Sequence, residues 1–247
     1  MQKGIKFRIY PNREQKNFIH QTLGCCRLIY NRGLAMRKEN CEEGKKIGYT
    51  QTSAMLTELK RQEEFAFLKA ADSIALQQSL RDLDRSFVNF FQKRASYPTF
   101  KSKHNRFQSY RTVNQKDNIR IVGRYIKLPK LGFVKIRQSM EVGKINHVTI
   151  EYTPAGKYFA VLNIDFEPEP RPNAGGMIGI DVGIKAFYSD SNGNTVSNPR
   201  YLERSMRKLI REQRRLSRKQ KDSHNRGKQR LRVARVHEKI ANQRNDF

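Results

Sequence analysis

The sequence predicts an α+β protein with more than one domain, and three observations predict it. A strand-like alternation at the N-terminus leads into a stretch with helical periodicity that lasts to about residue 95. Short β runs with turn residues between them then continue to residue 166. A Pro-rich linker, residues 167–173, separates them from a further β segment and strongly basic helices. A chain of 247 residues, 37% of them apolar, can form two or three modest domains.

The first strand and the first helix are each predicted by their own periodicity. Residues 3–10 alternate, with Ile5, Phe7 and Ile9 on one side. Pro11 and Asn12 then mark a strand end and a helix start. Apolar residues recur every three or four positions after them and predict a packed helix face: Ile19, Leu23, Cys26, Tyr30 and Leu34.

Two further helices are predicted before residue 95. Residues 50–53, Thr-Gln-Thr-Ser, give a helix start ahead of Met55, Leu56 and Leu59. The next helix has apolar residues on one face, namely Leu76, Leu80, Leu83, Phe87 and Phe91. Its opposite side is polar, with Gln77, Gln78, Arg81 and Arg85. Residues 1–95 are therefore one strand followed by a helical insert.

The central part of the chain predicts a small β-barrel. Five short β runs are separated by Gly- and Pro-containing turns: Ile119–Val122, Tyr125–Leu128, Phe133–Ile136, His147–Tyr152 and Tyr158–Phe166. Regular short strands of this kind favour a barrel, and the N-terminal strand could join it.

Asp181 lies in a predicted strand, residues 177–184, that starts a β meander. Its neighbours Ile180 and Val182 share an apolar face, whereas Asp181 shares the other face with Gly179 and Gly183. A carboxylate in an apolar strand is costly to bury unless a cation meets it. The two glycines leave room for a metal ion or a phosphate backbone, so Asp181 is a candidate ligand of a divalent cation.

Residues 201–247 are predicted to be helical and are the most basic part of the chain. They hold 16 Lys and Arg against 5 Asp and Glu, a net charge of +11. One apolar stripe is predicted to contain Leu202, Met206, Leu209 and Leu216. A polar break at residues 223–227 precedes a second helix that carries Val233, Val236 and Ile240. The density of cations favours an arm that binds a phosphate backbone over a merely solvated helix face.

The formal net charge of +27 makes nucleic acid the expected partner. The charge alone is equally consistent with a ribosomal-type protein that only packs against RNA. No apolar run approaches the length of a membrane span, and Gly175-Gly176 lacks phosphate-loop spacing. Cys25, Cys26 and Cys41 form no zinc-ligand pattern and are expected to be reduced, buried thiols of a cytoplasmic, nucleoid-associated protein.

Motifs along the whole chain resemble the TnpB (OrfB) proteins of bacterial insertion sequences, which are RNA-guided nucleases related to type V CRISPR effectors. No single motif is decisive, but many occur in the same order. They include residues 7–11 (FRIYP), 24–31 (GCCRLIYN), 80–83 (LRDL) with 89–91 (NFF), 98–103 (PTFKSK), 109–111 (SYR), 128–132 (LPKLG), 179–183 (GIDVG), 216–219 (LSRK) and 239–247 (KIANQRNDF).

The resemblance implies a division into three parts. A wedge-type β-barrel would comprise residues 1–10 plus 96–170, a helical recognition insert residues 11–95, and an incomplete RNase H-like (RuvC) domain residues 171–247. It implies a guide RNA and a double-stranded DNA target as partners, with no membrane and no small-molecule substrate. Asp181 matches the first of three catalytic acids, which hold Mg²⁺ ions for phosphodiester cleavage.

The chain also departs from the family pattern. In the family, the other two catalytic acids and a zinc-binding Cys cluster lie beyond the basic helices, so Zn²⁺ is expected only there. The acids that follow Asp181 here are expected in turns or on solvated helices: Asp190, Glu203, Glu212, Asp222, Glu238 and Asp246. With its Mg²⁺ site incomplete, the chain is expected to be a truncated endonuclease that does not cut DNA. A nuclease-dead, RNA-guided repressor and a generic RNA-binding protein are the alternatives.

Eleven further residues are candidates for nucleic-acid contacts. Tyr49, Ser53 and Gln77 match positions that the family uses to read its DNA motif, although a solvated helix face is the simpler reading. A second group lies among Phe100, Phe107 and Tyr110, where ordinary core aromatics beside surface cations are an equal alternative. This group consists of Lys101, Lys103, Arg106 and Arg111. The third group, expected to bind guide or heteroduplex phosphates, consists of Arg215, Arg218, Lys219 and Lys221.

Overall fold

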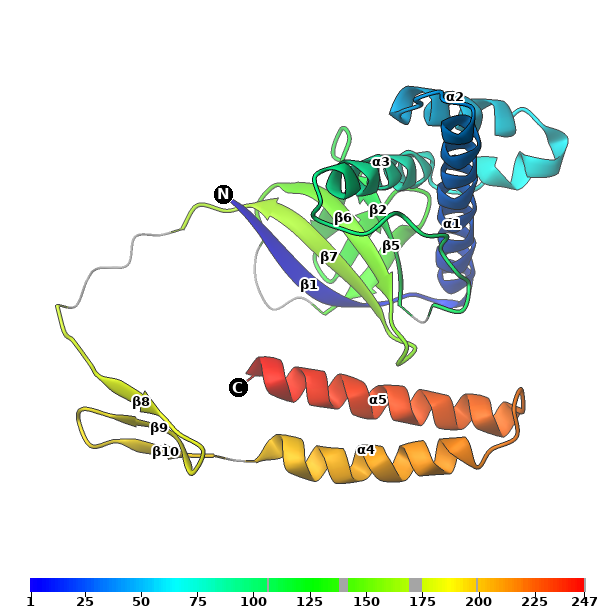
Figure 1. Ribbon diagram of the computed structural model, residues 1–247. Coiled ribbons are helices and arrows are strands. Elements are labelled where there is room, and N and C mark those ends of the chain that lie inside the picture. The colour runs from blue at the N-terminus through cyan, green and yellow to red at the C-terminus, as the bar shows by residue number, and fades with distance from the viewer. Residues whose placement is uncertain (106, 138–141, 169–174, 199, 247) are drawn as a thin grey trace. The chain divides into compact units, whose positions relative to one another are not determined.

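The computed structural model describes residues 1–105, 107–137, 142–168, 175–198 and 200–246. The chain divides into two compact units, residues 1–167 and 168–247 (Figure 1). The division falls at the Pro-rich segment of the sequence. Each unit has its own secondary structure and its own core, and each is described separately.

The first unit begins with a strand, three α-helices and a short 3₁₀ helix. Strand β1 (Gln2–Tyr10) is followed by α1 (Arg13–Glu42), α2 (Tyr49–Leu59), a short 3₁₀ helix η1 (Glu63–Lys69) and α3 (Ser73–Phe91). Helix α1 starts with a capping box, because the Asn12 side chain accepts a bond from the Gln15 N–H (2.8 Å) and the Gln15 side chain accepts one from the Asn12 N–H (3.0 Å). The predicted helix start at Asn12 is thereby confirmed.

Six strands complete the first unit and form one antiparallel sheet with β1. They are β2 (Gln108–Val113), β3 (Arg120–Val122), β4 (Tyr125–Leu128), β5 (Gly132–Ile136), β6 (Ile145–Tyr152) and β7 (Tyr158–Asp165). The strand order is β2-β6-β7-β1-β5-β4-β3, so β1 does join the sheet, between β7 and β5. The ladders of the described residues leave β2 and β3 as the end strands, and no pairing between these two closes the predicted barrel.

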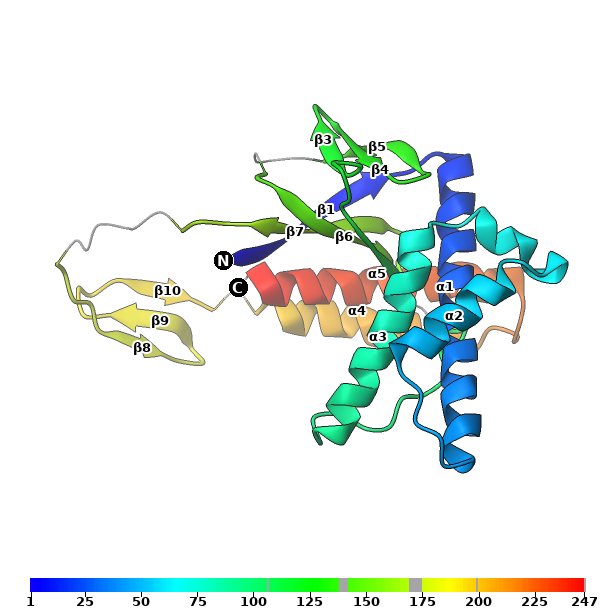
Figure 2. The ribbon, with the colours of Figure 1, turned by 90° about the horizontal axis from the view of Figure 1, so that it is seen from above.

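The helices of the first unit pack beside one another and against the sheet. Figure 2 shows α1 and α3 side by side with α2 against them, and both α1 and α3 contact β2. The predicted stripe of α1 is buried throughout, from Ile19 to Leu34. The predicted stripe of α3 is buried only as far as Phe87, whereas Phe91 is 75% exposed because it lies in the last turn of the helix, beyond the packed core. Cys25 and Cys26 are buried, but the prediction for Cys41 is wrong, since it is exposed near the end of α1.

The second unit consists of a small meander and a helical hairpin. Strands β8 (Ile180–Val182), β9 (Ala186–Asp190) and β10 (Thr195–Ser197) pair antiparallel in the order β10-β9-β8, as predicted, but β8 is shorter than the predicted 177–184. Helices α4 (Tyr201–Ser217) and α5 (His224–Asp246) share a core of Leu209, Val233, Val236 and Ile240. No helix in the described part of the chain has the length and apolar character needed to cross a membrane.

Two predictions for this hairpin are wrong. In α4 only Leu209 of the predicted stripe is buried, while Leu202 and Met206 are about 40% exposed. The buried face of α4 includes the polar residues Ser205 and Glu212. A search for apolar periodicity could not find this face, because these two residues are not apolar. Helix α5 starts at His224, inside the predicted polar break.

Candidate functional site

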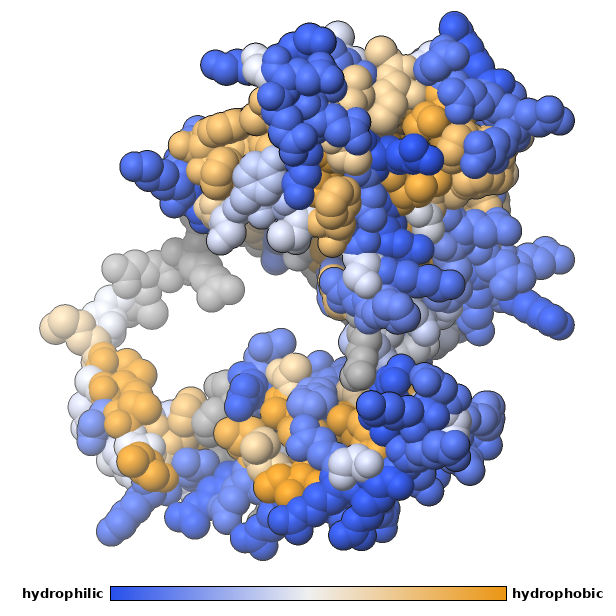
Figure 3. Space-filling model, turned by 45° about the vertical axis from the view of Figure 1, so that its right-hand side comes forward, coloured by the Kyte–Doolittle hydropathy of each residue, from blue (hydrophilic) through white to orange (hydrophobic). Residues whose placement is uncertain are grey.

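Asp181 lies at the centre of β8 and is exposed. Its cross-strand partner is Ser189 of β9, and the Ser189 hydroxyl lies 3.3 Å from the Thr195 hydroxyl of β10. Because directly opposite residues of antiparallel strands point to the same face, one face of the meander carries a row of one carboxylate and two hydroxyls. The apolar side chains of this segment are exposed as well, with Ile180 at 59% and Val182 at 70%. Figure 3 shows hydrophobic side chains gathered on this segment.

The residues around Asp181 do not make a complete site for Mg²⁺. Among the described residues, no three His, Cys, Asp or Glu side chains come together in a way that could hold a metal ion. Asp190 is the nearest acid in sequence, but it pairs with Ile180 and so belongs to the other face of the meander. Its carboxylate accepts bonds from the N–H of Asn192 and from the N–H and side-chain amide of Asn194. These bonds, chiefly those from Asn194, lower the pKa of Asp190.

The candidate cations of residues 101–111 have different environments. The Lys101 ammonium lies 4.1 Å from the centre of the Tyr30 ring, and desolvation lowers its pKa although the residue as a whole is exposed. Arg111 forms an ion pair with Asp82 of α3. Lys103 is exposed, and Arg106 lies outside the described residues. Lys103 is therefore the exposed member of this group for which the described residues show neither an ion pair, as Arg111 has, nor a ring contact, as Lys101 has.

The aromatic residues of the same segment are partly exposed and partly buried. Phe100 is 52% exposed and lies under the Lys38 ammonium, 4.9 Å from its ring centre. Phe107 is 47% exposed. Tyr110 is buried at 7% exposure, and burial strongly raises its pKa. Tyr110 is thus a core residue, whereas Phe100 and Phe107 have faces that a base could stack on.

Tyr49, Ser53 and Gln77 belong to one surface of the helical insert. Tyr49 and Ser53 are four residues apart on α2, so they share a face, and both are half-buried. Gln77 is exposed on α3, one turn before Arg81. The Arg81 guanidinium lies 4.9 Å from the centre of the Tyr49 ring and so connects the two helices. Arg81 was not among the predicted contacts, although its spacing from Gln77 gave the signal.

The basic helices place the four predicted phosphate-binding residues near the turn of the hairpin. Arg215 donates to Glu212 at 3.1 Å, Arg218 is the C-cap of α4, and the Lys219 carbonyl accepts a bond from Arg226 at 2.8 Å. The side chains of Arg218, Lys219 and Lys221 are exposed. The expectation that Glu212 lies on a solvated face is wrong, because its side chain is 8% exposed and accepts a bond from Gln229 at 2.7 Å.

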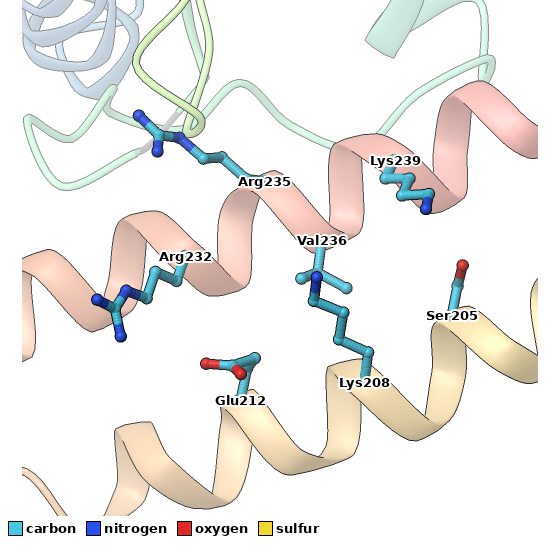
Figure 4. A pocket seen from close by; sticks show the side chains of 7 residues that line it. All are labelled: Ser205, Lys208, Glu212, Arg232, Arg235, Val236 and Lys239. Atoms are coloured by element: carbon cyan, nitrogen blue, oxygen red, sulfur yellow. The ribbon is translucent and has the colours of Figure 1, made fainter.

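A groove of 440 Å³ lies between α4 and α5 (Figure 4). It is lined by Ser205, Lys208, Glu212, Arg232, Arg235, Val236 and Lys239. The four cations of this groove were not predicted as individual contacts. The signal for them was present in α5, where positions 232, 235 and 239 share a helix face.

The comparisons with known proteins cover the whole chain. A family model described as a probable transposase of the OrfB type matches residues 147–247, and a second OrfB model, described as a helix-turn-helix domain, matches residues 1–46. A Streptomyces pristinaespiralis protein named "Putative RNA-guided DNA endonuclease" is 37% identical over 100% of this chain and 62% of its own length. The chain belongs to the TnpB (OrfB) family.

A second relative of this TnpB-family chain matches it to the same extent as the first. The "Putative RNA-guided DNA endonuclease InsQ" of Escherichia coli is 36% identical over 99% of this chain and 61% of its own length. The chain therefore spans about three fifths of the length of these relatives. The protein chain of a solved CRISPR-Cas12f ternary complex has a similar structure, with a TM-score of 0.44 and 13% sequence identity. The match covers 94% of this chain and 58% of the Cas12f chain.

The structure of residues 1–46 differs from the description of the second TnpB-family model. These residues form β1 and one continuous helix, Arg13–Glu42, and not two helices joined by a turn. The long helix buries its apolar stripe against α3 and the sheet. The described fold thus gives this segment a role in the core of the first unit.

Proposed function

We propose that this chain binds a guide RNA and, through it, a double-stranded DNA target. The observation that supports the proposal is the collinear similarity, over essentially the whole chain, to two relatives named RNA-guided DNA endonucleases. A net charge of +27 suits a protein that surrounds polyanions, because binding releases the counterions of each phosphate it neutralises. In such complexes base pairing to the guide selects the target sequence.

We infer a role for each part of the chain. Residues 1–10 and 96–170 would form a wedge-like domain, with residues 11–95 inserted as a recognition domain. This division is supported by β1, which pairs with β7 and β5 although three helices separate it from them in sequence. Residues 171–247 would form part of an RNase H-like (RuvC) domain. In the insert, the surface of Tyr49, Ser53, Gln77 and Arg81 would read the DNA motif.

Asp181 is proposed to be the metal-binding acid of the nuclease domain. Two-metal phosphodiester cleavage needs several oxygen ligands, and Mg²⁺ bound there would activate water and stabilise the leaving oxygen. The face of the meander that carries Asp181 provides one carboxylate, so the described residues do not fit a complete site. We therefore propose that this 247-residue chain binds RNA and DNA without cutting DNA by itself.

The test is to purify the chain with the RNA that accompanies it and to sequence that RNA. One dominant structured RNA is expected, followed by binding of a DNA duplex that matches its guide segment and no cleavage with Mg²⁺. A mixture of unrelated RNAs, with equal binding to matched and unmatched duplexes, would show a generic basic RNA-binding protein. Guide-dependent cleavage would refute the inactive state while leaving the binding function in place.

A further inference from the structure

The groove between α4 and α5 concentrates positive charge on both of its walls (Figure 4). Lys208 comes from α4, whereas Arg232, Arg235 and Lys239 come from α5, and all four residues are exposed. None of the ion pairs found among the described residues includes Lys208, Arg235 or Lys239. These three cations are therefore available to an anionic ligand.

The groove cations follow the helix axes. Residues 232, 235 and 239 are spaced i, i+3, i+7, which places them on one face of α5 along about 10 Å of helix. On α4, Lys208, Arg211 and Arg215 repeat the same spacing. The phosphates of one nucleic-acid strand follow one another at roughly 3.4 Å along a helix axis, so each row is about as long as three phosphate-to-phosphate steps.

Among the described residues, the acid in the groove pairs with two cations of the α4 row, Arg211 and Arg215, and with none of the four cations that line the groove. Glu212 accepts bonds from Gln229 (2.7 Å) and Arg215 (3.1 Å), with Arg211 at 3.9 Å. Its pKa is lowered, chiefly by the Gln229 bond, so it is ionised at neutral pH and engaged with its own partners. The Ser205 hydroxyl is likewise engaged, because it donates to Gln243 at 2.7 Å. The polar floor of the groove is thus satisfied within the hairpin, and its walls keep their excess of charge.

We propose that this groove binds the phosphodiester backbone of a nucleic-acid strand, with Lys208 on one side and Arg232, Arg235 and Lys239 on the other. Glu212 and Gln229 are buried and bonded to each other across the two helices, and so they fix the walls of the groove relative to each other. The inference deepens the proposed function and depends on it for the identity of the strand, which is the guide RNA if that function is correct.

The test compares two full-length variants that lose the same charge. The groove variant carries Lys208→Gln, Arg235→Gln and Lys239→Gln. The control carries Arg214→Gln, Arg230→Gln and Arg244→Gln, which are exposed residues of the same helices that do not line the groove. Their affinities for a single-stranded RNA of about 20 nucleotides, and for DNA of the same sequence, are measured by fluorescence anisotropy across salt concentrations.

The groove variant is expected to bind RNA roughly tenfold more weakly and to reduce the slope of log K against log salt by about 2, since each lost phosphate contact removes about 0.7. The control is expected to stay within about twofold of the unchanged protein, because its cations only add to the general field. Unchanged far-UV circular dichroism verifies that both variants fold.

The outcomes separate the two proposals. Equal losses in the groove variant and the control would overturn the groove as a site while leaving RNA binding intact. Groove-dependent binding of DNA without binding of RNA would support the groove and overturn the guide-RNA function. If the unchanged chain binds neither strand, both proposals are overturned.

Discussion

At the level of single residues, the acids of α3 and of its N-cap make contacts that stabilise the fold. Asp82 forms an ion pair with Arg111 of β2, and Asp84 forms one with Arg37 of α1. Arg37 is 7% exposed and its guanidinium also lies 4.7 Å from the centre of the Phe87 ring. Asp72 caps the start of α3. Asp82 and Asp84 thus join α3 to its neighbours, whereas Asp72 stabilises the first turn of α3 itself.

Replacing Asp72 by Ala is expected to destabilise the first unit by about 1 to 2 kcal/mol, because Asp72 is the N-cap of α3. Its carboxylate accepts bonds from the N–H groups of Ile74 (2.9 Å) and Ala75 (3.4 Å), and the residue is 4% exposed. Urea unfolding followed by tyrosine fluorescence measures the change. Asp72→Asn is the control and is expected to retain most of the stability, since an amide oxygen also caps a helix. Equal losses in both variants would contradict the capping role.

At the scale of elements, the sequence predicted those whose buried face is apolar and missed those whose buried face is partly polar. The stripe of α1 from Ile19 to Leu34 has helical periodicity and is buried as predicted. Strand β2 was missed because its inward residues are Tyr110 and Thr112, which give no hydrophobic alternation. The buried face of α4 was missed for the same reason, since it includes Glu212.

In the candidate site, the sequence predicted the strand that carries Asp181 but not the side chains that pair with Arg111 and Glu212. The alternation around Asp181 placed it on a β strand, because a period of two is visible in the sequence, and the structure shows that this strand is exposed. The partners of Arg111 and Glu212 come from elements 29 and 17 residues away along the chain. Local periodicity contains no information about such distant partners. The sequence therefore contained no sign that the charges of Arg111 and Glu212 are paired within the fold.

Glu212 is expected to make the stability of the α4–α5 hairpin depend on pH. Its pKa is lowered from the ordinary value of 4.5, so its charged form stabilises the hairpin above that pH. This contribution is lost as the pH falls through the lowered pKa. Glu212→Gln, which removes the charge but keeps an acceptor, should lower the thermal midpoint at 222 nm at pH 7. The variant and the unchanged protein should converge at acidic pH.

Glu203→Gln provides the matched control for this pH dependence. Glu203 accepts a bond from Arg207 at 3.0 Å, but both side chains are more than half exposed. Exposed pairs of this kind contribute little, because solvent screens them. Glu203→Gln should therefore leave the midpoint almost unchanged at every pH. A Glu212→Gln midpoint that differs from the unchanged protein equally at pH 7 and at acidic pH would show a packing effect instead of a charge effect.

At the scale of the whole molecule, the two units have separate cores. The main core of the first unit contains residues from Phe7 to Ile164, and the core of the hairpin contains Leu209, Val233, Val236 and Ile240. Since a domain with its own core can fold alone, we expect the first unit to be stable without the second.

A fragment of residues 1–167 is therefore expected to fold by itself, with a thermal midpoint within a few degrees of the matching transition in the whole chain. The sheet is complete in this fragment, because β7 is present between β1 and β6. A fragment of residues 1–152 is the control. It lacks β7, so β1 loses its long ladder from Gln2 to Ile9, and we expect it to be unfolded. Circular dichroism and dispersion of amide proton signals distinguish the folded from the unfolded fragment. An unfolded 1–167 fragment would mean that the second unit contributes to the stability of the first, and the independence of the two units would be refuted.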